Sequence, residues 1–598
     1  MNELNAIVKK FADSGWNLLE GVCTDWLMGK CSDTELYEVI KLADDECGNC
    51  GCEFDPLYKR ALEILRIKNI ERNNTMKYQI FSENEWVFPD SEITNAGGKA
   101  ELYAARGSDV NFQLLTDTAL EGGEDFAFDV CGLEAEVIVY QLMPAYVSKN
   151  SGPKTHTTDD YESVKDFVIR KAPFDIYDVT KPTDSGKLDA GRAAFYVRIN
   201  VAYDAVPGQY DGCIILNIAG EKSEIPVALK VYNTQVPKLE DSAFHMVNWI
   251  YYKKLAEQYG VELYSEEYRA ILGKFFENQL DMRNDYLMIP AGEPIRDENG
   301  KVVDFDFTGA EFVGKMAIYY GFKYIMGGFV ARFNRWDEPD QYLLWDREVG
   351  VSTIEGFRQL KIYFKKAWEC VVKNGWQSKY MQCMVDEPQF PNSLSYRALA
   401  GICRQMMPGV KINDPVETCD IAGACDVWAV KQAVYEKHYE NFRKLQDMGE
   451  EMWLYTCGFP AGKTMNRVMD LPLTVSRLPM WLCYKYDCPG FLHWGYHAYN
   501  PVGDIVDGKV DGTTPSGGNY PAGNAYIVYL GDGRPWYGVR AHSQRTGAQD
   551  YELFNILGQR DKAKAVELIE KVCRTFDDYD GSAKLFDEVR HELLEILG

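Results

Sequence analysis

Eight short apolar runs recur between residues 244 and 494, and helical patterns separate most of them. Parallel strands need long crossover connections, usually helices, so this alternation favours a parallel α/β fold. Eight such units are typical of a (β/α)8 TIM barrel. The predicted strands are Phe244–Ile250, Tyr286–Ile289, Tyr324–Met326, Tyr380–Val385, Lys411–Asn413, Asp426–Ala429, Met452–Thr456 and Gly490–Trp494. The predicted helices between them include Glu267–Met282, Ile354–Lys373, Leu394–Met407 and Val434–Gly449.

The rest of the chain divides by its periodicity. Residues 1–73 show helical spacing and are expected to form a short N-terminal helical region. Residues 76–237 carry short runs of β-forming residues separated by turn residues, which indicates an all-β sandwich domain. The catalytic barrel is expected over 241–560. Two charged helices over 561–598 are expected to pack on it.

Bulk composition excludes several classes of protein. The net charge of −26 argues against nucleic-acid binding and against anionic membrane surfaces. No apolar run approaches the ~20 residues of a membrane span, and the N-terminus lacks the pattern of a signal peptide. The 16 cysteines are scattered through apolar segments, as expected of reduced thiols. We therefore expect a cytoplasmic protein with no membrane or nucleic-acid partner; the sequence does not predict its oligomeric state.

Three cysteines lie close together in the N-terminal region. Cys47, Cys50 and Cys52 could bind zinc, but no second C-x-x-C follows and the spacing is not that of a standard zinc knuckle. Thiols in a glycine-rich loop are the simpler interpretation. We therefore expect no metal and no cofactor.

Two adjacent acids follow the fourth predicted strand. Asp386 and Glu387 come directly after the apolar run 380–385, and Pro388 ends it. Chemistry in a parallel barrel takes place at the carboxyl ends of the strands, and carboxyl pairs there suit acid/base work on a sugar. In the simpler interpretation, Asp386 caps a helix and Glu387 is a solvated loop residue. The surrounding strand ends favour the catalytic interpretation.

Other predicted strand ends carry aromatic and polar side chains that could line a sugar site. Aromatic rings can stack on the apolar face of a sugar, while amide and imidazole groups bind its hydroxyls. Each one alone could equally be a packed residue at the top of the barrel. The candidates are His245, Asn248, Trp249, Trp428, Tyr455, Trp494, Tyr496 and Asn500. Motifs of serine esterases, zinc proteases, dinucleotide-binding enzymes and P-loop proteins are absent.

Four segments together resemble glycoside hydrolase family 123 and its related domain of formerly unknown function. They are Met384–Pro388, Glu451–Cys457, Gly490–Tyr496 and Val539–Glu552. The last is a partial match, since His542-Ser543 replaces the usual Leu-Glu and Thr546 the usual Asp. The resemblance covers roughly residues 77–560 and excludes the N-terminal helices.

The resemblance implies a retaining β-N-acetylgalactosaminidase that uses its substrate's own 2-acetamido group as nucleophile. Asp386 would hold the acetamido N–H, and Glu387 would protonate the glycosidic oxygen and later activate water. The negative charge of Asp386 is expected to raise the pKa of Glu387. Tyr455 is the candidate for binding the acetamido oxygen, and Trp428 and Trp494 for enclosing the methyl group.

Two alternatives stay open. The same barrel could act on another sugar, such as β-linked N-acetylglucosamine, because the residues that recognise the 4-hydroxyl are not identifiable. The chain could also be a non-catalytic carbohydrate-binding protein, although the intact acid pair speaks against it.

Overall fold

The computed structural model describes the chain except for residues 1–2, 49–50, 74–75, 155 and 499–519. It contains two compact units: Met1–Lys77 with Glu124–Phe128 and Ile215–Glu224, and the remainder of the chain. The helices of the smaller unit enclose their own core around Leu4, Phe11 and Ile40. These helices are α1 (Glu3–Ala12), α2 (Asn17–Leu27), α3 (Asp33–Cys47) and α4 (Asp55–Asn73).

Two mainly antiparallel sheets precede the barrel in the chain, as predicted. One has seven strands in the order β1-β3-β9-β5-β8-β26-β25, and the other has the order β2-β11-β10-β4. The strands are β1 (Tyr78–Ser82), β2 (Ala100–Arg106), β3 (Asp109–Leu120), β4 (Phe126–Cys131), β5 (Glu136–Val147), β8 (Phe174–Pro182), β9 (Gly191–Asn200), β10 (Gly208–Ile218), β11 (Glu221–Gln235), β25 (Val528–Leu530) and β26 (Pro535–Gly538). β6 (Asn150–Ser151) and β7 (Thr157–Thr158) form a short separate pair.

One edge of the seven-stranded sheet is formed by residues outside the predicted sandwich domain. β25 and β26 lie after the barrel in sequence, yet β26 pairs with β8. Pairing between segments this far apart in the sequence cannot be identified from periodicity alone. The chain therefore returns to the first sheet after it leaves the barrel.

The eight predicted barrel strands all form, and they pair in parallel in sequence order. Their hydrogen-bonded ladder runs β12-β24-β23-β22-β21-β20-β16-β13 and so nearly closes a barrel. The strands are β12 (His245–Asn248), β13 (Tyr286–Ile289), β16 (Tyr324–Gly327), β20 (Tyr380–Gln382), β21 (Lys411–Val416), β22 (Val427–Lys431), β23 (Glu451–Thr456) and β24 (Gly490–His493).

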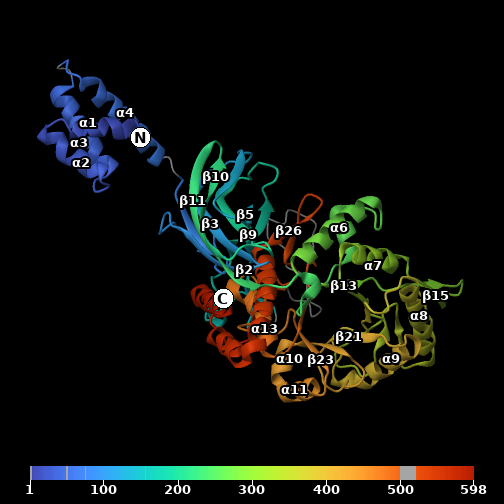
Figure 1. Cartoon of the computed structure of the whole chain (residues 1–598). Helices are drawn as coiled ribbons and strands as arrows, with labels where there is room; N and C mark the ends of the chain where they lie inside the picture. The colour runs from blue at the N-terminus through green and yellow to red at the C-terminus, as the bar shows by residue number, and fades with distance from the viewer. Residues whose placement is uncertain (1–2, 49–50, 74–75, 155, 499–519) are drawn as a thin grey trace. The chain divides into compact units, whose positions relative to one another are not determined.

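Helices cover most of the outside of this barrel (Figure 1). They are α5 (Tyr252–Tyr259), α6 (Glu266–Asp281), α7 (Thr308–Tyr320), α8 (Ile354–Lys373), α9 (Ser393–Met406), α10 (Gln432–Lys437), α11 (Tyr439–Asp447) and α12 (Leu478–Lys485). Small strands extend two of the loops: β14 (Glu293–Arg296), β15 (Val302–Asp306), β17 (Ala331–Arg332), β18 (Tyr342–Leu343) and β19 (Asp346–Gly350). None of the helices in the described ranges is long and apolar enough to cross a bilayer.

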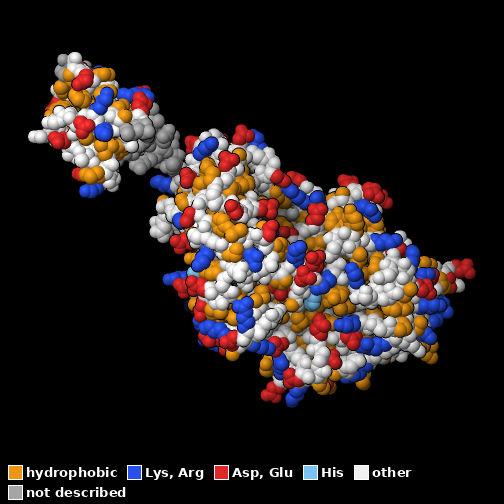
Figure 2. Space-filling model, in the orientation of Figure 1, with side chains coloured by type: hydrophobic (Ala, Val, Ile, Leu, Met, Phe, Trp, Pro, Cys, Tyr) orange, Lys and Arg blue, Asp and Glu red, His pale blue; other side chains and the backbone are white. Residues whose placement is uncertain are grey.

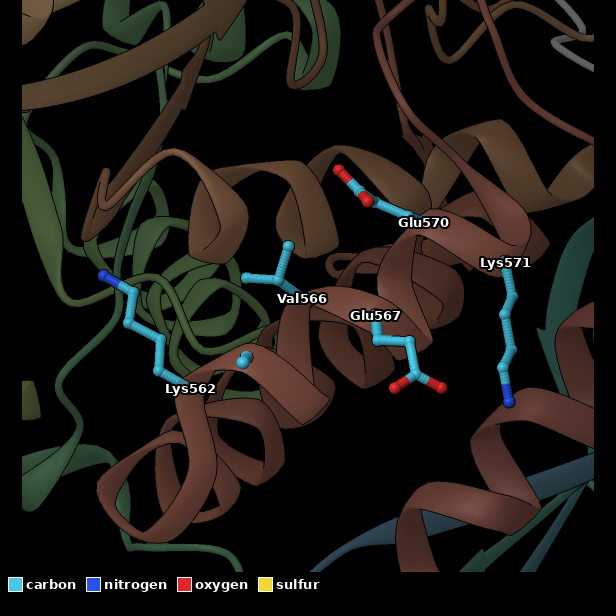
Figure 3. Close-up of a pocket in the computed structure, with 6 residues that line it drawn as sticks. Lys562, Val566, Glu567, Glu570 and Lys571 are labelled. Carbon is cyan, nitrogen blue, oxygen red and sulfur yellow. The ribbon is translucent and has the colours of Figure 1, made fainter.

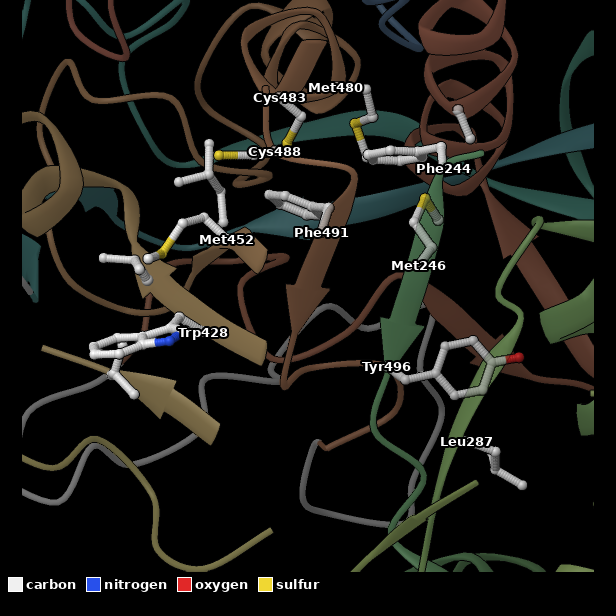
Figure 4. Packing of buried hydrophobic residues seen from close by; sticks show 14 of the residues in the cluster. Phe244, Met246, Leu287, Trp428, Met452, Met480, Cys483, Cys488, Phe491 and Tyr496 are labelled. Carbon is white, nitrogen blue, oxygen red and sulfur yellow. The ribbon is translucent and has the colours of Figure 1, made fainter. Parts of the chain in front are cut away.

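The barrel strands alternate between two apolar layers. On β22, Val427 and Ala429 pack in the barrel interior, whereas Trp428 and Val430 pack in the layer under the helices. Figure 4 shows Trp428 in this outer layer, in the same cluster as Met452 of the neighbouring strand. Side chains alternate because successive strand residues point to opposite faces. The odd-numbered side chains of β22 and β23 therefore point toward the barrel axis.

A long helix, α13 (Val539–Val572), fastens the barrel to the first sheet. Its first half is almost wholly buried, and its charged residues are paired across elements. Arg540 meets Asp178 of β8 at 2.8 Å, and Arg545 meets Asp109 of β3 at 3.1 Å. α13 departs from helical geometry at Asp561, next to the predicted start of the C-terminal helices. α14 (Ala583–Leu597) packs against α13 and also against β2, not on the barrel alone.

The charges on the visible face do not gather into one patch. Acidic and basic side chains are interspersed there (Figure 2). Among the described residues, no three His, Cys, Asp or Glu side chains come together as a metal site requires. Cys50 lies outside the described residues, so the structure does not test the possible zinc site.

Candidate active site

Asp386 and Glu387 lie just beyond the end of β20, the fourth barrel strand. The intervening backbone is fixed on both sides. The N–H of Met384 donates to the Asp414 carboxylate at 2.8 Å, and Val385 bridges to Ala331. The strand count from sequence therefore placed the pair at the mouth of the barrel correctly.

The backbone turns at Glu387 itself. Its φ is +53°, in the left-handed region that residues with a side chain seldom adopt. Adjacent residues of a regular strand would direct their side chains to opposite faces, and this turn relieves that constraint. Strain of this kind persists where surrounding structure holds it, commonly at active sites. Here the Glu387 N–H donates to the carbonyl of Pro415 at 3.0 Å, and the Glu417 N–H to that of Pro388 at 3.1 Å.

Three side chains converge on one oxygen of Glu387. Its Oε1 accepts a hydrogen bond from the Tyr455 hydroxyl at 2.5 Å and lies 3.1 Å from the Lys431 ammonium. The Cys457 thiol is 3.7 Å from the same oxygen. The Glu387 side chain is 13% exposed, so it reaches solvent while these contacts hold it in place.

A third acid, Glu417, joins the pair from the end of β21. Its Oε1 forms an ion pair with Lys431, and its Oε2 accepts from the Gln389 amide at 3.2 Å. Burial raises the pKa of Glu417 and the charge of Glu387 adds to the rise, while the Lys431 ammonium opposes it. Three carboxyls and one ammonium group thus form one contiguous cluster.

Burial raises the pKa of Asp386 to about 8, and the negative charges of Glu387 and Glu417 act in the same direction against Lys431. Strongly interacting acids titrate as a unit. Near neutral pH the pair therefore retains a proton, which gives one acid and one carboxylate.

Three predicted residues lie with this pair at the barrel mouth. Trp249, Tyr455 and Trp494 belong to one aromatic cluster inside the barrel. The Trp494 ring lies 5.0 Å from that of Tyr520, whose raised pKa results from burial and from the nearby Cys457 thiol and acid pair. Tyr455 contacts the acid directly, which the sequence did not predict.

Asn248 contributes indirectly. It is buried at the end of β12, where its Oδ1 accepts a hydrogen bond from the Arg467 guanidinium at 2.7 Å. Its amide donates to Asn284 at 2.8 Å. Asn248 thus holds a rim loop in place and is not aimed freely at a ligand.

The structure does not bring three other candidates to the site. His245 begins β12, so it lies at the opposite, amino end of the barrel, 2.7 Å from Asp285. Trp428 faces the outer layer, where its indole N–H donates to Glu450 at 3.0 Å. Tyr496 is buried and donates to Asn278 of α6 at 2.6 Å. Asn500 lies outside the described residues.

Sequence reasoning missed Glu417, Lys431 and Cys457. Strand periodicity could have found them. Lys431 continues the inward-facing series of Val427 and Ala429, and Cys457 continues that of Trp453 and Tyr455. A lysine at an inward position of an otherwise apolar strand is costly unless it is paired.

A surface hollow also lies on α13, and its lining does not include these acids (Figure 3). Its lining includes Glu567, Glu570 and Lys571, which form ion pairs with other side chains at the surface. Exposed pairs of this kind are solvated and carry little energy. The hollow therefore lacks the features of a catalytic site.

The sequence profile of the glycoside hydrolase 123 catalytic domain matches residues 249–557, more than half of the chain. This chain belongs to glycoside hydrolase family 123. The matched region begins at Trp249 and contains the Asp386–Glu387 pair. The protein is therefore a glycoside hydrolase, as its sequence motifs predicted.

A solved relative has a fold similar to that of this family 123 protein. A family 123 glycoside hydrolase from Clostridium perfringens, studied for glycolipid glycan hydrolysis, is 12% identical with a TM-score of 0.65 and covers 88% of this chain and 98% of its own. An endo-β-1,4-mannanase from Thermotoga petrophila is 12% identical with a TM-score of 0.35 and covers 53% of this chain and 78% of its own. No curated protein sequence matches the chain.

Proposed function

We propose that this glycoside hydrolase removes terminal β-linked N-acetylgalactosamine with retention of configuration, using the substrate's 2-acetamido oxygen as nucleophile. The proposal rests on one observation: the two acidic residues Asp386 and Glu387 are adjacent. An ordinary retaining enzyme places two carboxyls ~5 Å apart across the scissile bond, one of them as nucleophile. Here Asp386, Glu387 and Glu417 form one group at the ends of neighbouring strands.

Each member of the pair has a distinct role in this reaction. Asp386, as the carboxylate, accepts the acetamido N–H and stabilises the positive charge that develops on the oxazolinium ring. Glu387 gives its proton to the glycosidic oxygen and later removes one from the attacking water. Tyr455 orients Glu387 through its hydrogen bond. Trp494 is proposed to pack on the acetamido methyl group.

The substrate is a glycan end. The Clostridium perfringens relative is described in terms of glycolipid glycan hydrolysis. We extend that substrate class to this chain and name terminal N-acetylgalactosamine as the sugar removed. N-acetylglucosamine is the competing sugar, and it differs only in the orientation of one hydroxyl.

A panel of aryl glycosides tests the choice of sugar. We expect hydrolysis of the β-N-acetylgalactosaminide at least about 100-fold faster than hydrolysis of the β-galactoside without the acetamido group, since loss of the internal nucleophile removes the reaction path. An N-acetylgalactosamine thiazoline should inhibit competitively. Equal rates on the β-N-acetylgalactosaminide and the β-galactoside, together with no inhibition by the thiazoline, would exclude substrate assistance. Faster hydrolysis of the β-N-acetylglucosaminide would change only the identity of the sugar.

The pH dependence of kcat/KM follows from the proton that the pair retains. Below the raised pKa of Asp386, about 8, the pair holds this proton, and above it the proton is lost. The pair then has no proton to give to the leaving group. We expect kcat/KM to fall tenfold per unit above about pH 8. A profile that stays flat to pH 10 would contradict this assignment.

A further inference from the structure

The acid pair does not stand alone at the barrel mouth. Lys431 is 5% exposed, and Glu387 and Glu417 are 13% and 18% exposed. With all three carboxyls ionised beside one ammonium group, the cluster would carry an excess of negative charge in a poorly solvated place. Such a state is costly, so the cluster retains protons instead.

Lys431 lies between two of these acids. Its ammonium is 3.1 Å from Glu387 Oε1 and also pairs with Glu417 Oε1. The ring centroids of Tyr455 and Phe459 lie 5.7 and 5.6 Å from the same ammonium nitrogen. Burial opposes the charge of Lys431, but the nearby Glu387 and Glu417 carboxylates raise its pKa, so it stays protonated.

Glu417 makes the second contact. Its carboxyl pairs with the same Lys431 ammonium as that of Glu387, and its other partner is the Gln389 amide. Two carboxyl groups can form a hydrogen bond only when one of them carries a proton. Glu387 and Glu417 pair with one ammonium group, so they are placed to share a proton.

Three tyrosine hydroxyls and one cysteine thiol that face the cluster do not change their charge. Tyr455 and Cys457 donate to Glu387, and Tyr520 and Tyr251 face the acid pair. Burial raises the pKa of all four, so they stay neutral across the working range. Asp414 also lies near Asp386, and burial raises its pKa, while the Tyr396 hydroxyl and the Met384 N–H donate to it.

We propose that Glu417 and Lys431 are positioning residues for the acid/base step: Glu417 shares a proton with Glu387, and Lys431 limits how many protons the three carboxyls hold. This inference rests on the proposed acid/base role of Glu387. When substrate binds, the shared proton is on Glu387 and passes to the glycosidic oxygen as the bond to the sugar breaks. In the second step Glu387 takes a proton from water, and Glu417 gains or loses none overall.

Opposite shifts of the pH profile test this proposal. Glu417→Gln removes a negative neighbour and should move the alkaline limb of kcat/KM about one unit lower. Lys431→Met removes the positive neighbour and should move it about one unit higher. Both should lower kcat about tenfold with little change in KM, because they disturb proton transfer and not binding. Lys431→Arg keeps the charge and should restore the limb.

Lys437→Met on α10 and Glu440→Gln on α11 are exposed matched controls and should leave the profile unchanged. If both test variants lower kcat but leave the limb in place, or move it in the same direction, the proposal is wrong. Should Lys431→Met not fold, the direction of the Glu417→Gln shift decides alone. If Glu387→Gln keeps full activity, the proposed acid/base role of Glu387 is wrong. That result is distinct from failure of the positioning proposal, which the two test variants decide.

Discussion

Glu387→Gln should lower kcat/KM about 10³-fold on an aryl glycoside with a poor leaving group, because the leaving oxygen then receives no proton in the transition state. On a dinitrophenyl glycoside, whose leaving group needs no proton, the loss should be about tenfold. Steady-state kinetics on the two substrates measures the difference. The Tyr455 contact to Glu387 Oε1 survives in the glutamine variant, so its geometry is retained.

Asp386→Asn provides the comparison within the pair. Its role is to stabilise charge on the acetamido group, so its loss should be similar with both leaving groups. Glu440→Gln serves as an exposed control of the same chemistry. If Glu387→Gln and Asp386→Asn respond alike to the leaving group, the two roles are not divided as proposed.

Asp178→Ala should lower the free energy of unfolding by about 3–5 kcal/mol, because it leaves the buried Arg540 guanidinium without its counterion. Both side chains are fully buried and lie 2.8 Å apart. Tyr529 also loses its acceptor, since its hydroxyl donates to Asp178 at 2.6 Å. Urea denaturation followed by tryptophan fluorescence measures the change.

An exposed ion pair offers the matched control. Asp184 pairs with Arg534 at 2.5 Å, with the two side chains 63% and 40% exposed. Asp184→Ala should cost no more than about 1 kcal/mol, since water screens the pair. Equal effects of the two substitutions would mean that the buried pair contributes nothing to fastening α13 to the first sheet.

The fold was largely predictable because its signals are local. All eight barrel strands were predicted within a few residues, since each combines a short apolar run with a following helix or turn. β25 and β26 could not be predicted in the same way. The pairing of β26 with β8 joins segments separated by the whole barrel, and no local pattern encodes such a contact.

The site was predictable only in part. Asp386 and Glu387 are adjacent in sequence and follow a clear strand. Glu417 and Lys431 come from other strands, and their meeting depends on barrel closure and on which face each strand turns inward. The position of Trp428 depends on strand register as well. Its ring lies outside the barrel because successive residues of a strand face opposite sides.

The central claim is that the substrate's own acetamido group attacks the anomeric carbon, and a series of aryl N-acetylgalactosaminides with zero to three fluorines on the acetamido methyl tests it most directly. Each fluorine makes the carbonyl oxygen a weaker nucleophile without greatly changing the size of the group. We expect kcat/KM to fall by orders of magnitude along the series, while the aryl leaving group and its protonation by the enzyme stay the same. Rates that are unchanged by fluorine would contradict the account and require an enzyme carboxylate, or water, as the nucleophile.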